Sequence, residues 1–112
     1  MKRKFAIPFS ENQLSKHFGK AEYFIIIETE NKSVITSKRI KTPDHEHGQL
    51  PKWISDQGVT HIITGGIGQK AMARLQELNI ELIYGVETEK PELLVQKFLD
   101  GNLQSGLNLC DH

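Results

Sequence analysis

Cysteine is nearly absent from this sequence: Cys110 is the only one among 112 residues. A single cysteine excludes an intrachain disulfide and the CxxC pairs that usually mark a zinc site. The first residues are basic, but no long apolar segment follows them as it does in a signal peptide. These features favour a reducing compartment, and we expect a cytoplasmic protein.

Long hydrophobic segments and an excess of charge are missing as well. The longest strongly apolar run, residues 23–27, is far shorter than the ~20 residues that span a bilayer, so we expect no membrane association. Fourteen basic residues balance 14 acidic ones, which leaves no net field to attract phosphate backbones. We therefore expect no nucleic acid partner, and short basic clusters at residues 2–4 and 38–41 are predicted to be solvated strand ends.

The remaining composition is that of an ordinary globular domain. Hydrophobic residues make up 38% of the chain and charged residues 25%. A chain of this length buries over ~60% of its unfolded surface in one core, so it needs no disulfide or metal to fold. We expect one domain over residues 1–103 and a flexible C-terminal tail over residues 104–112.

Five short segments have the composition of β-strands. They are rich in apolar, aromatic and β-branched residues and are bounded by turn-forming residues. The segments are residues 5–9, 23–29, 33–40, 59–64 and 80–84. Residues 23–29 and 33–40 should form a hairpin around the break at residues 30–32. His61 lies at the start of an apolar strand, and we expect its role to be structural.

Three further segments have apolar residues at helical spacing. The first begins with Leu50, Trp53 and Ile54 and should end at Gly58. The second follows the glycines at residues 65–68 and should end at Asn79, which tolerates the left-handed cap conformation. The third covers about residues 89–99 and should end at Gly101. Between hairpin and first helix, residues 41–48 have no periodicity and are predicted to form an exposed loop.

The order of these elements, βββαβαβα, predicts an α/β fold. An antiparallel meander followed by right-handed parallel crossovers gives a mixed five-stranded sheet in a single domain. This order matches the ribonuclease H-like architecture, although a fold alone assigns no chemistry. Two-metal nucleases need several converging carboxylates, and the first strand, residues 5–9, has none. Nuclease activity is therefore not expected.

The side chains that suit soft metals lie outside the hydrophobic segments. His17 precedes a turn, His45 and His47 share a polar loop, and Cys110 and His112 close the C-terminus. Imidazole and thiolate suit iron, zinc and copper. In an extended backbone, side chains two residues apart point the same way. His45 and His47 can therefore bind one metal ion together, and so can Cys110 and His112. Alternatively, the loop histidines are ordinary solvated side chains and the cysteine is a spare thiol.

The segment Gly65-Gly66-Ile67-Gly68 joins a predicted strand to a predicted helix. Backbone amides at such a turn, together with the helix dipole, can face an anion, and small residues let a bulky ligand approach. The segment is neither GxGxxG nor a P-loop, since no Lys-Ser or Lys-Thr follows Gly68. A tight turn without a ligand is the alternative interpretation.

Three segments taken together resemble one known family. They are residues 15–24 (SKHFGKAEYF), the GGIG turn with Ala71 and Leu75 behind it, and residues 98–103 (FLDGNL). The sequence is similar, over nearly its whole length, to the dinitrogenase iron-molybdenum cofactor biosynthesis family, of the NifX and NifB C-terminal type. One departure is Asn79, where a glycine is expected and where the cap conformation tolerates the change.

The resemblance implies a ribonuclease H-like domain that binds or carries an iron-sulfur cluster or an iron-molybdenum cofactor precursor and catalyses no reaction. His17 of the HFG segment becomes the first candidate ligand, with Phe18 and Gly19 beside it. Gly65, Gly66 and Gly68 become a cradle for an anionic cluster.

The remaining candidate metal ligands are His45, His47, Cys110 and His112. Family members vary in the loop that holds the two histidines, and only some small members have a comparable tail. The implied partners are the metal-sulfur cofactor and cofactor-assembly proteins. The alternative function is a protein interaction or regulatory module of the same fold without metal cargo. Covalent catalysis by Cys110 lacks a recognisable base partner.

Overall fold

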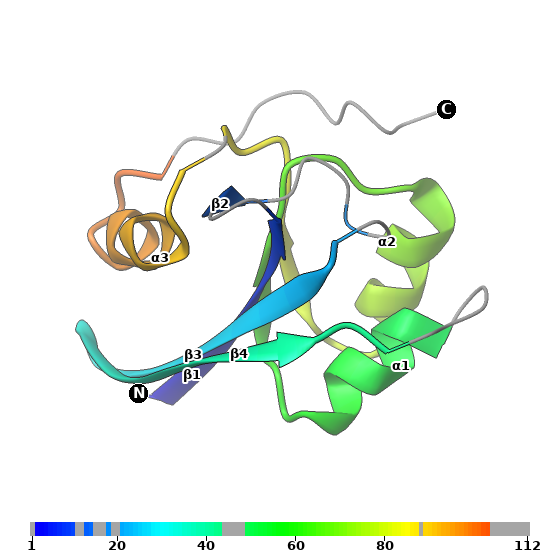
Figure 1. The fold of residues 1–112 in the computed structure, drawn as a ribbon, viewed down its shortest axis with the longest axis horizontal. Coiled ribbons are helices and arrows are strands. Elements are labelled where there is room, and N and C mark those ends of the chain that lie inside the picture. The colour runs from blue at the N-terminus through cyan, green and yellow to red at the C-terminus, as the bar shows by residue number, and fades with distance from the viewer. Residues whose placement is uncertain are drawn as a thin grey trace.

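A mixed β-sheet lies between two layers of helices (Figure 1). The structure, a computed structural model, describes residues 2–10, 13–14, 18, 21–43, 49–87 and 89–103. The strands among these residues are β1 (Lys2–Ser10), β2 (Gln13–Leu14), β3 (Tyr23–Glu30), β4 (Ser33–Lys41), β5 (His61–Ile63) and β6 (Glu81–Ile83). The helices are α1 (Gln49–Asp56), α2 (Gln69–Glu77) and α3 (Pro91–Leu99).

The strands follow the order β4-β3-β1-β5-β6 across the sheet. Strands β1, β3 and β4 form an antiparallel meander, and β5 and β6 continue the sheet parallel to β1. The mixed five-stranded α/β domain predicted from the sequence is confirmed. The predicted order βββαβαβα is incomplete, because β2 pairs with the end of β1 through Phe9 and Leu14. A two-residue strand is too short to produce a hydrophobic period.

Alternating side chains divide the sheet between two hydrophobic cores. On β1, Ala6 faces one core while Phe5 and Ile7 face the other, because successive strand residues point to opposite faces. The core under α1 and α2 includes Phe24, Ile26, Ile54, Ile62 and Leu75. The core under α3 includes Ile25, Ile27, Ile63, Leu94 and Val95. Figure 1 shows α3 on one side of the sheet and α1 and α2 on the other.

The predicted helix ends are confirmed by backbone conformation. Gly58, Asn79 and Gly101 follow the three helices and have φ angles of 79°, 61° and 77°. Glycine adopts this left-handed conformation at no steric cost, and asparagine tolerates it. Helix α3 starts at Pro91, two residues later than predicted, because proline suits the first helical position, where no backbone N–H is required.

Other boundaries differ modestly from the predictions. Strand β1 covers residues 2–10 rather than 5–9, and β5 and β6 are shorter than predicted, at three residues each. The predicted tail at residues 104–112 and most of the predicted loop, residues 44–48, lie outside the described residues. No helix in the described part of the chain has the length and hydropathy of a bilayer-spanning segment.

Candidate functional site

The glycine turn lies at the carboxyl end of β5, next to the first residues of α2. In open α/β sheets, ligands usually bind outside the carboxyl ends of the strands. Gly65 and Gly66 are buried, and Ile67 is 1% exposed and packs in the core under α1 and α2. Gly68 is exposed. Ile67 thus fixes the turn to the hydrophobic core, and of the three glycines only Gly68 is exposed to solvent.

Backbone hydrogen bonds tie this turn to two other segments. The carbonyl oxygen of Gly66 accepts a bond from the backbone N–H of Phe18 at 3.0 Å, and that of Gly65 accepts one from Gly85 at 2.6 Å. The Thr64 hydroxyl also points at the Gly66 carbonyl, at 3.4 Å. Two of the predicted cofactor-binding segments, HFG and GGIG, are therefore in direct contact although they are far apart in sequence.

The Phe18 side chain is part of the hydrophobic core. The ring is 2% exposed and packs edge-on against Phe24, with 5.6 Å between the ring centroids. Phe24 packs in turn against Trp53 of α1 at 5.9 Å. The structure thus places the Phe18 ring in the core under α1 and α2.

The buried glycines of the turn are explained by close backbone packing. Gly65 and Gly66 are not among the glycines with positive φ, which in the described part of the chain are Gly58, Gly85 and Gly101. Both are instead buried where other backbone segments come within hydrogen-bonding distance. The requirement at these two positions is therefore not for a left-handed backbone, and their burial beside bonded backbone segments is consistent with close packing.

Gly68 has different surroundings and is the residue that leaves room for a ligand. It is the N-cap residue of α2, with φ −72° and ψ 154°, and a Cβ added there would meet no atom within 4 Å. The first turn of α2 has no acidic residue and includes Lys70. The exposed N-cap residue, the positive end of the helix dipole and the nearby Lys70 in the chain are features that favour an anion.

The predicted metal ligands are not placed by the structure. His17, His45, His47, Cys110 and His112, together with Gly19, lie outside the described residues. Among the residues that are described, no three His, Cys, Asp or Glu side chains gather as a metal site. His17 is nevertheless the chain neighbour of Phe18, whose position against the glycine turn is fixed.

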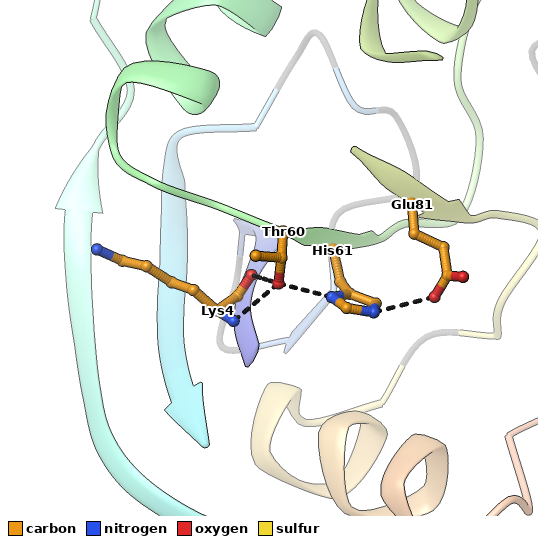
Figure 2. Close-up of polar contacts among 4 residues, drawn as sticks. All are labelled: Lys4, Thr60, His61 and Glu81. Carbon is orange, nitrogen blue, oxygen red and sulfur yellow. Dashed lines mark hydrogen bonds and ion pairs between the residues drawn. The ribbon is translucent and has the colours of Figure 1, made fainter. Parts of the chain in front are cut away.

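His61 lies at the other end of β5, away from the glycine turn. Figure 2 shows its ring linked on both sides, with Nε2 3.0 Å from Glu81 Oε2 and Nδ1 2.7 Å from Thr60 Oγ1. The Thr60 hydroxyl oxygen accepts a hydrogen bond from the Lys4 backbone N–H at 2.9 Å. The ring also contacts Phe5 and Phe98, at centroid distances of 5.0 and 5.5 Å.

The Thr60 hydroxyl also donates a hydrogen bond to the Lys4 carbonyl oxygen at 3.1 Å, so its oxygen is joined to the Lys4 backbone on one side and to His61 Nδ1 on the other. On the other side of the ring, a hydrogen on Nε2 is donated to the Glu81 carboxylate. Burial lowers the pKa of His61, which outweighs the opposite effect of the Glu81 carboxylate, and Arg3 lowers the pKa further. The network joins β1, β5 and β6, in keeping with the structural role predicted for His61.

A groove beside α3 was not anticipated from the sequence. A groove of about 360 Å³ lies between β4 and the start of α3, with Arg39 and Lys90 among its lining residues. The basic cluster at residues 38–41 was the available signal, but it was interpreted as a solvated strand end. Its proximity to α3 depends on tertiary packing that no local pattern reveals.

Comparison with known proteins gives close matches in sequence and in fold. Uncharacterized protein MJ0580 of Methanocaldococcus jannaschii is 33% identical over 106 residues, which cover 90% of this chain and 89% of that protein. The crystal structure of PH0822 is 31% identical, covers 91% of this chain and 93% of its own, and superimposes with a TM-score of 0.85. The apo form of the orange protein from Desulfovibrio gigas shares the fold, with a TM-score of 0.76, 21% identity and coverage of 95% and 94%.

One family description covers most of the chain. The sequence profile described as "Dinitrogenase iron-molybdenum cofactor" matches residues 1–101, which include the HFG segment, the glycine turn and all three helices. The resemblance noted from the sequence is thereby confirmed. The chain belongs to the dinitrogenase iron-molybdenum cofactor family.

Proposed function

We propose that this protein is a non-catalytic carrier that binds an iron-sulfur cluster or an iron-molybdenum cofactor precursor during metallocofactor assembly. Membership of the family supports a role in this chemistry. The observation that carries the proposal is the hydrogen bond between Phe18 and Gly66, because it unites the two segments whose residues suit cluster binding. In this proposal the cluster is cargo, delivered to and collected by cofactor-assembly proteins.

The cradle for the cargo is formed by the glycine turn and the start of α2. Metal-sulfur clusters with thiolate or sulfide are anionic, and the first amides of α2 offer positive partial charge. Gly68 leaves this end of the helix uncovered, and Lys70 adds a positive side chain nearby in the chain. These residues would hold the cluster by electrostatic attraction rather than by covalent bonds, which suits a group that must later be released.

Direct ligation is assigned to the histidine of the HFG segment. His17 precedes the buried Phe18, so its backbone is attached to a fixed point of the fold. Imidazole is a suitable ligand for iron. The proposed additional ligands are His45, His47, Cys110 and His112. If one chain supplies too few ligands, a second copy of the chain would supply the rest, so that two chains share one cluster.

The carrier proposal includes no catalytic step. The described side chains that fix the turn are Phe18, Thr64 and Ile67, and none of them is an acid or a base. The sheet order supports the ribonuclease H-like architecture as a description of the fold, used here for binding. A cytoplasmic location is part of the proposal, since oxygen-sensitive clusters and a single free cysteine both suit a reducing compartment.

The alternative function is a protein interaction or regulatory module without metal cargo. One observation favours it, namely the exposed edge of the sheet at β4. Val34 and Ile35 on this strand are 41% and 51% exposed, and an edge strand of nine residues offers unpaired backbone groups to a partner strand.

Anaerobic reconstitution distinguishes the two functions. The purified protein is incubated with iron and sulfide, or with isolated iron-molybdenum cofactor, and its absorption spectrum and metal content are measured after desalting. The carrier proposal predicts stoichiometric uptake and stabilisation of the fold by the bound group. Absence of uptake under every condition would exclude the carrier and leave the interaction module.

A further inference from the structure

The groove between β4 and α3 has an apolar floor and charged walls. Phe9, Ile25 and Pro91 form its apolar part, and Ile25 and Pro91 are themselves buried. The positive side chains are Arg39 from β4 and Lys90 from the residue before α3. Lys38 is also part of the lining, but its side chain leaves β4 on the opposite face of the sheet, because Lys38 pairs with Ile26 of the core under α1 and α2. Ser37 and Glu92 are also part of the lining.

This groove is separate from the proposed cluster site. Ile25 and Phe9 pack in the core under α3, whereas Phe18 and Ile67 pack in the core under α1 and α2. The two cores lie on opposite faces of the sheet, and Figure 1 shows α3 on the side away from α2. A ligand in the groove and cargo at the glycine turn therefore occupy different surfaces.

The cations of the groove are available to a ligand. Arg39 and Lys90 form no ion pair with any other described residue. The Arg39 guanidinium lies over the Tyr23 ring, 4.6 Å from its centroid. A cation–π contact of this kind restrains the guanidinium beside the ring. A guanidinium restrained in this way can pair with a planar anion through its N–H donors.

The groove also contains one negative group, the Glu92 carboxylate, which partly offsets its positive charge. The Glu92 carboxylate lies in the first turn of α3, and its Oε1 is 3.5 Å from the Ser37 hydroxyl of β4. Two cations, Arg39 and Lys90, against one carboxylate leave the groove positive. The nearby carboxylate nevertheless disfavours a second negative charge on the ligand, since like charges repel at short range. A singly charged anion fits this arrangement better than a phosphate dianion does.

We propose that this groove binds a small organic anion in which one carboxylate is joined to an apolar group. The carboxylate pairs with the guanidinium of Arg39, whose planar donor fork matches a carboxylate in two hydrogen bonds. The apolar group covers Phe9, Ile25 and Pro91. A volume of about 360 Å³ lies near the lower end of ligand pockets, so the ligand is small.

The proposal is tested by NMR titration of ¹⁵N-labelled protein with benzoate as the probe. Saturable shift changes are expected at the backbone amides of Ile25, Ser37 and Glu92. Benzyl alcohol has the ring without the charge, and acetate has the charge without the ring, so both should bind at least about tenfold more weakly than benzoate. Equal binding of either control, or no saturable change with benzoate, overturns the proposal.

Two charge variants locate the binding site. Arg39→Gln should weaken benzoate binding about tenfold, because it removes a charged hydrogen-bond donor from an exposed position without disturbing the core. Lys52→Gln makes the same change in charge on α1, on the opposite side of the sheet and outside both proposed sites, and should bind benzoate as the wild type does. Equal affinity in Arg39→Gln and wild type would overturn the assignment of the groove.

Discussion

The backbone N–H of Phe18 donates a hydrogen bond to the carbonyl oxygen of Gly66 at 3.0 Å. Each partner belongs to a segment that the family match includes, and each is buried. The bond makes the position of the HFG segment depend on the compactness of the glycine turn. The carrier proposal assigns the neighbouring His17 and the start of α2 to one binding site because of this bond.

Gly68→Val tests the cradle without unfolding the protein. The added side chain enters open space at an ordinary φ of −72°, so we expect the free energy of unfolding to change by less than about 1 kcal/mol. Cluster uptake should fall several-fold, because the side chain covers the start of α2. The measurements are urea denaturation and iron content after anaerobic reconstitution.

Ala73→Val is the matched control for this substitution, since Ala73 is exposed on the same helix beyond its first turn. It should leave uptake unchanged. If Gly68→Val and Ala73→Val take up as much iron as the wild type, the first turn of α2 does not contact the cargo.

Thr29→Val should stabilise the fold. The Thr29 hydroxyl is fully buried on β3 and has no hydrogen-bond partner among the described residues. Burial of an unpaired hydroxyl costs roughly 1–3 kcal/mol, and valine has nearly the same shape without the polar atom. We expect a gain of about 1 kcal/mol in the free energy of unfolding, measured by urea denaturation.

Thr36→Val provides the comparison for Thr29→Val. Thr36 lies on β4 and is exposed, so the same substitution should alter stability by less than about 0.5 kcal/mol. A loss of stability in Thr29→Val would show that the buried hydroxyl has a partner after all.

His61 should titrate below its ordinary pKa of 6.5 in the folded protein, because burial disfavours the imidazolium. Glu81→Gln should lower this pKa further, since it removes the carboxylate that favours the charged form. Arg3→Gln should raise it, since it removes a repelling charge. NMR titration of the histidine ring protons in the three proteins measures these shifts, and a shift in the opposite direction would contradict the network shown in Figure 2.

The same network makes the free energy of unfolding depend on pH. In the unfolded chain His61 becomes protonated near pH 6.5, whereas in the folded protein its pKa is lower and protonation requires a lower pH. The stability associated with His61 is therefore present above pH 6.5 and is lost as the pH falls toward the folded pKa. His61→Gln should reduce the pH dependence of the unfolding free energy in this range. An unchanged dependence would mean that other groups determine it.

Local sequence features predicted most of the fold. Gly58, Asn79 and Gly101 end helices because a left-handed backbone conformation suits these residue types, a property that can be recognised without tertiary information. The apolar, β-branched run of β3 and the helical spacing in α2 are equally local. Strand β2 was missed because Gln13 and Leu14 owe their pairing to the return of the chain along β1.

The sites were less accessible from sequence. The contact between His61 and Glu81 depends on the parallel register of β5 and β6, which pairs these two residues directly. The groove depends on the packing of α3 over β3 and β4, which brings Lys90 near Arg39. The glycine turn was recognised, but its bond to Phe18 required the fold. In each case the missing information is the relative placement of distant segments.

The most direct test of the carrier is the iron content per chain after anaerobic reconstitution of wild type, His17→Ala and His61→Gln. The account predicts stoichiometric iron with a cluster absorption band in the wild type, its loss in His17→Ala, and its retention in His61→Gln, whose histidine lies at the other end of β5. Equal iron content in wild type and His17→Ala, or no iron in the wild type, would contradict the account.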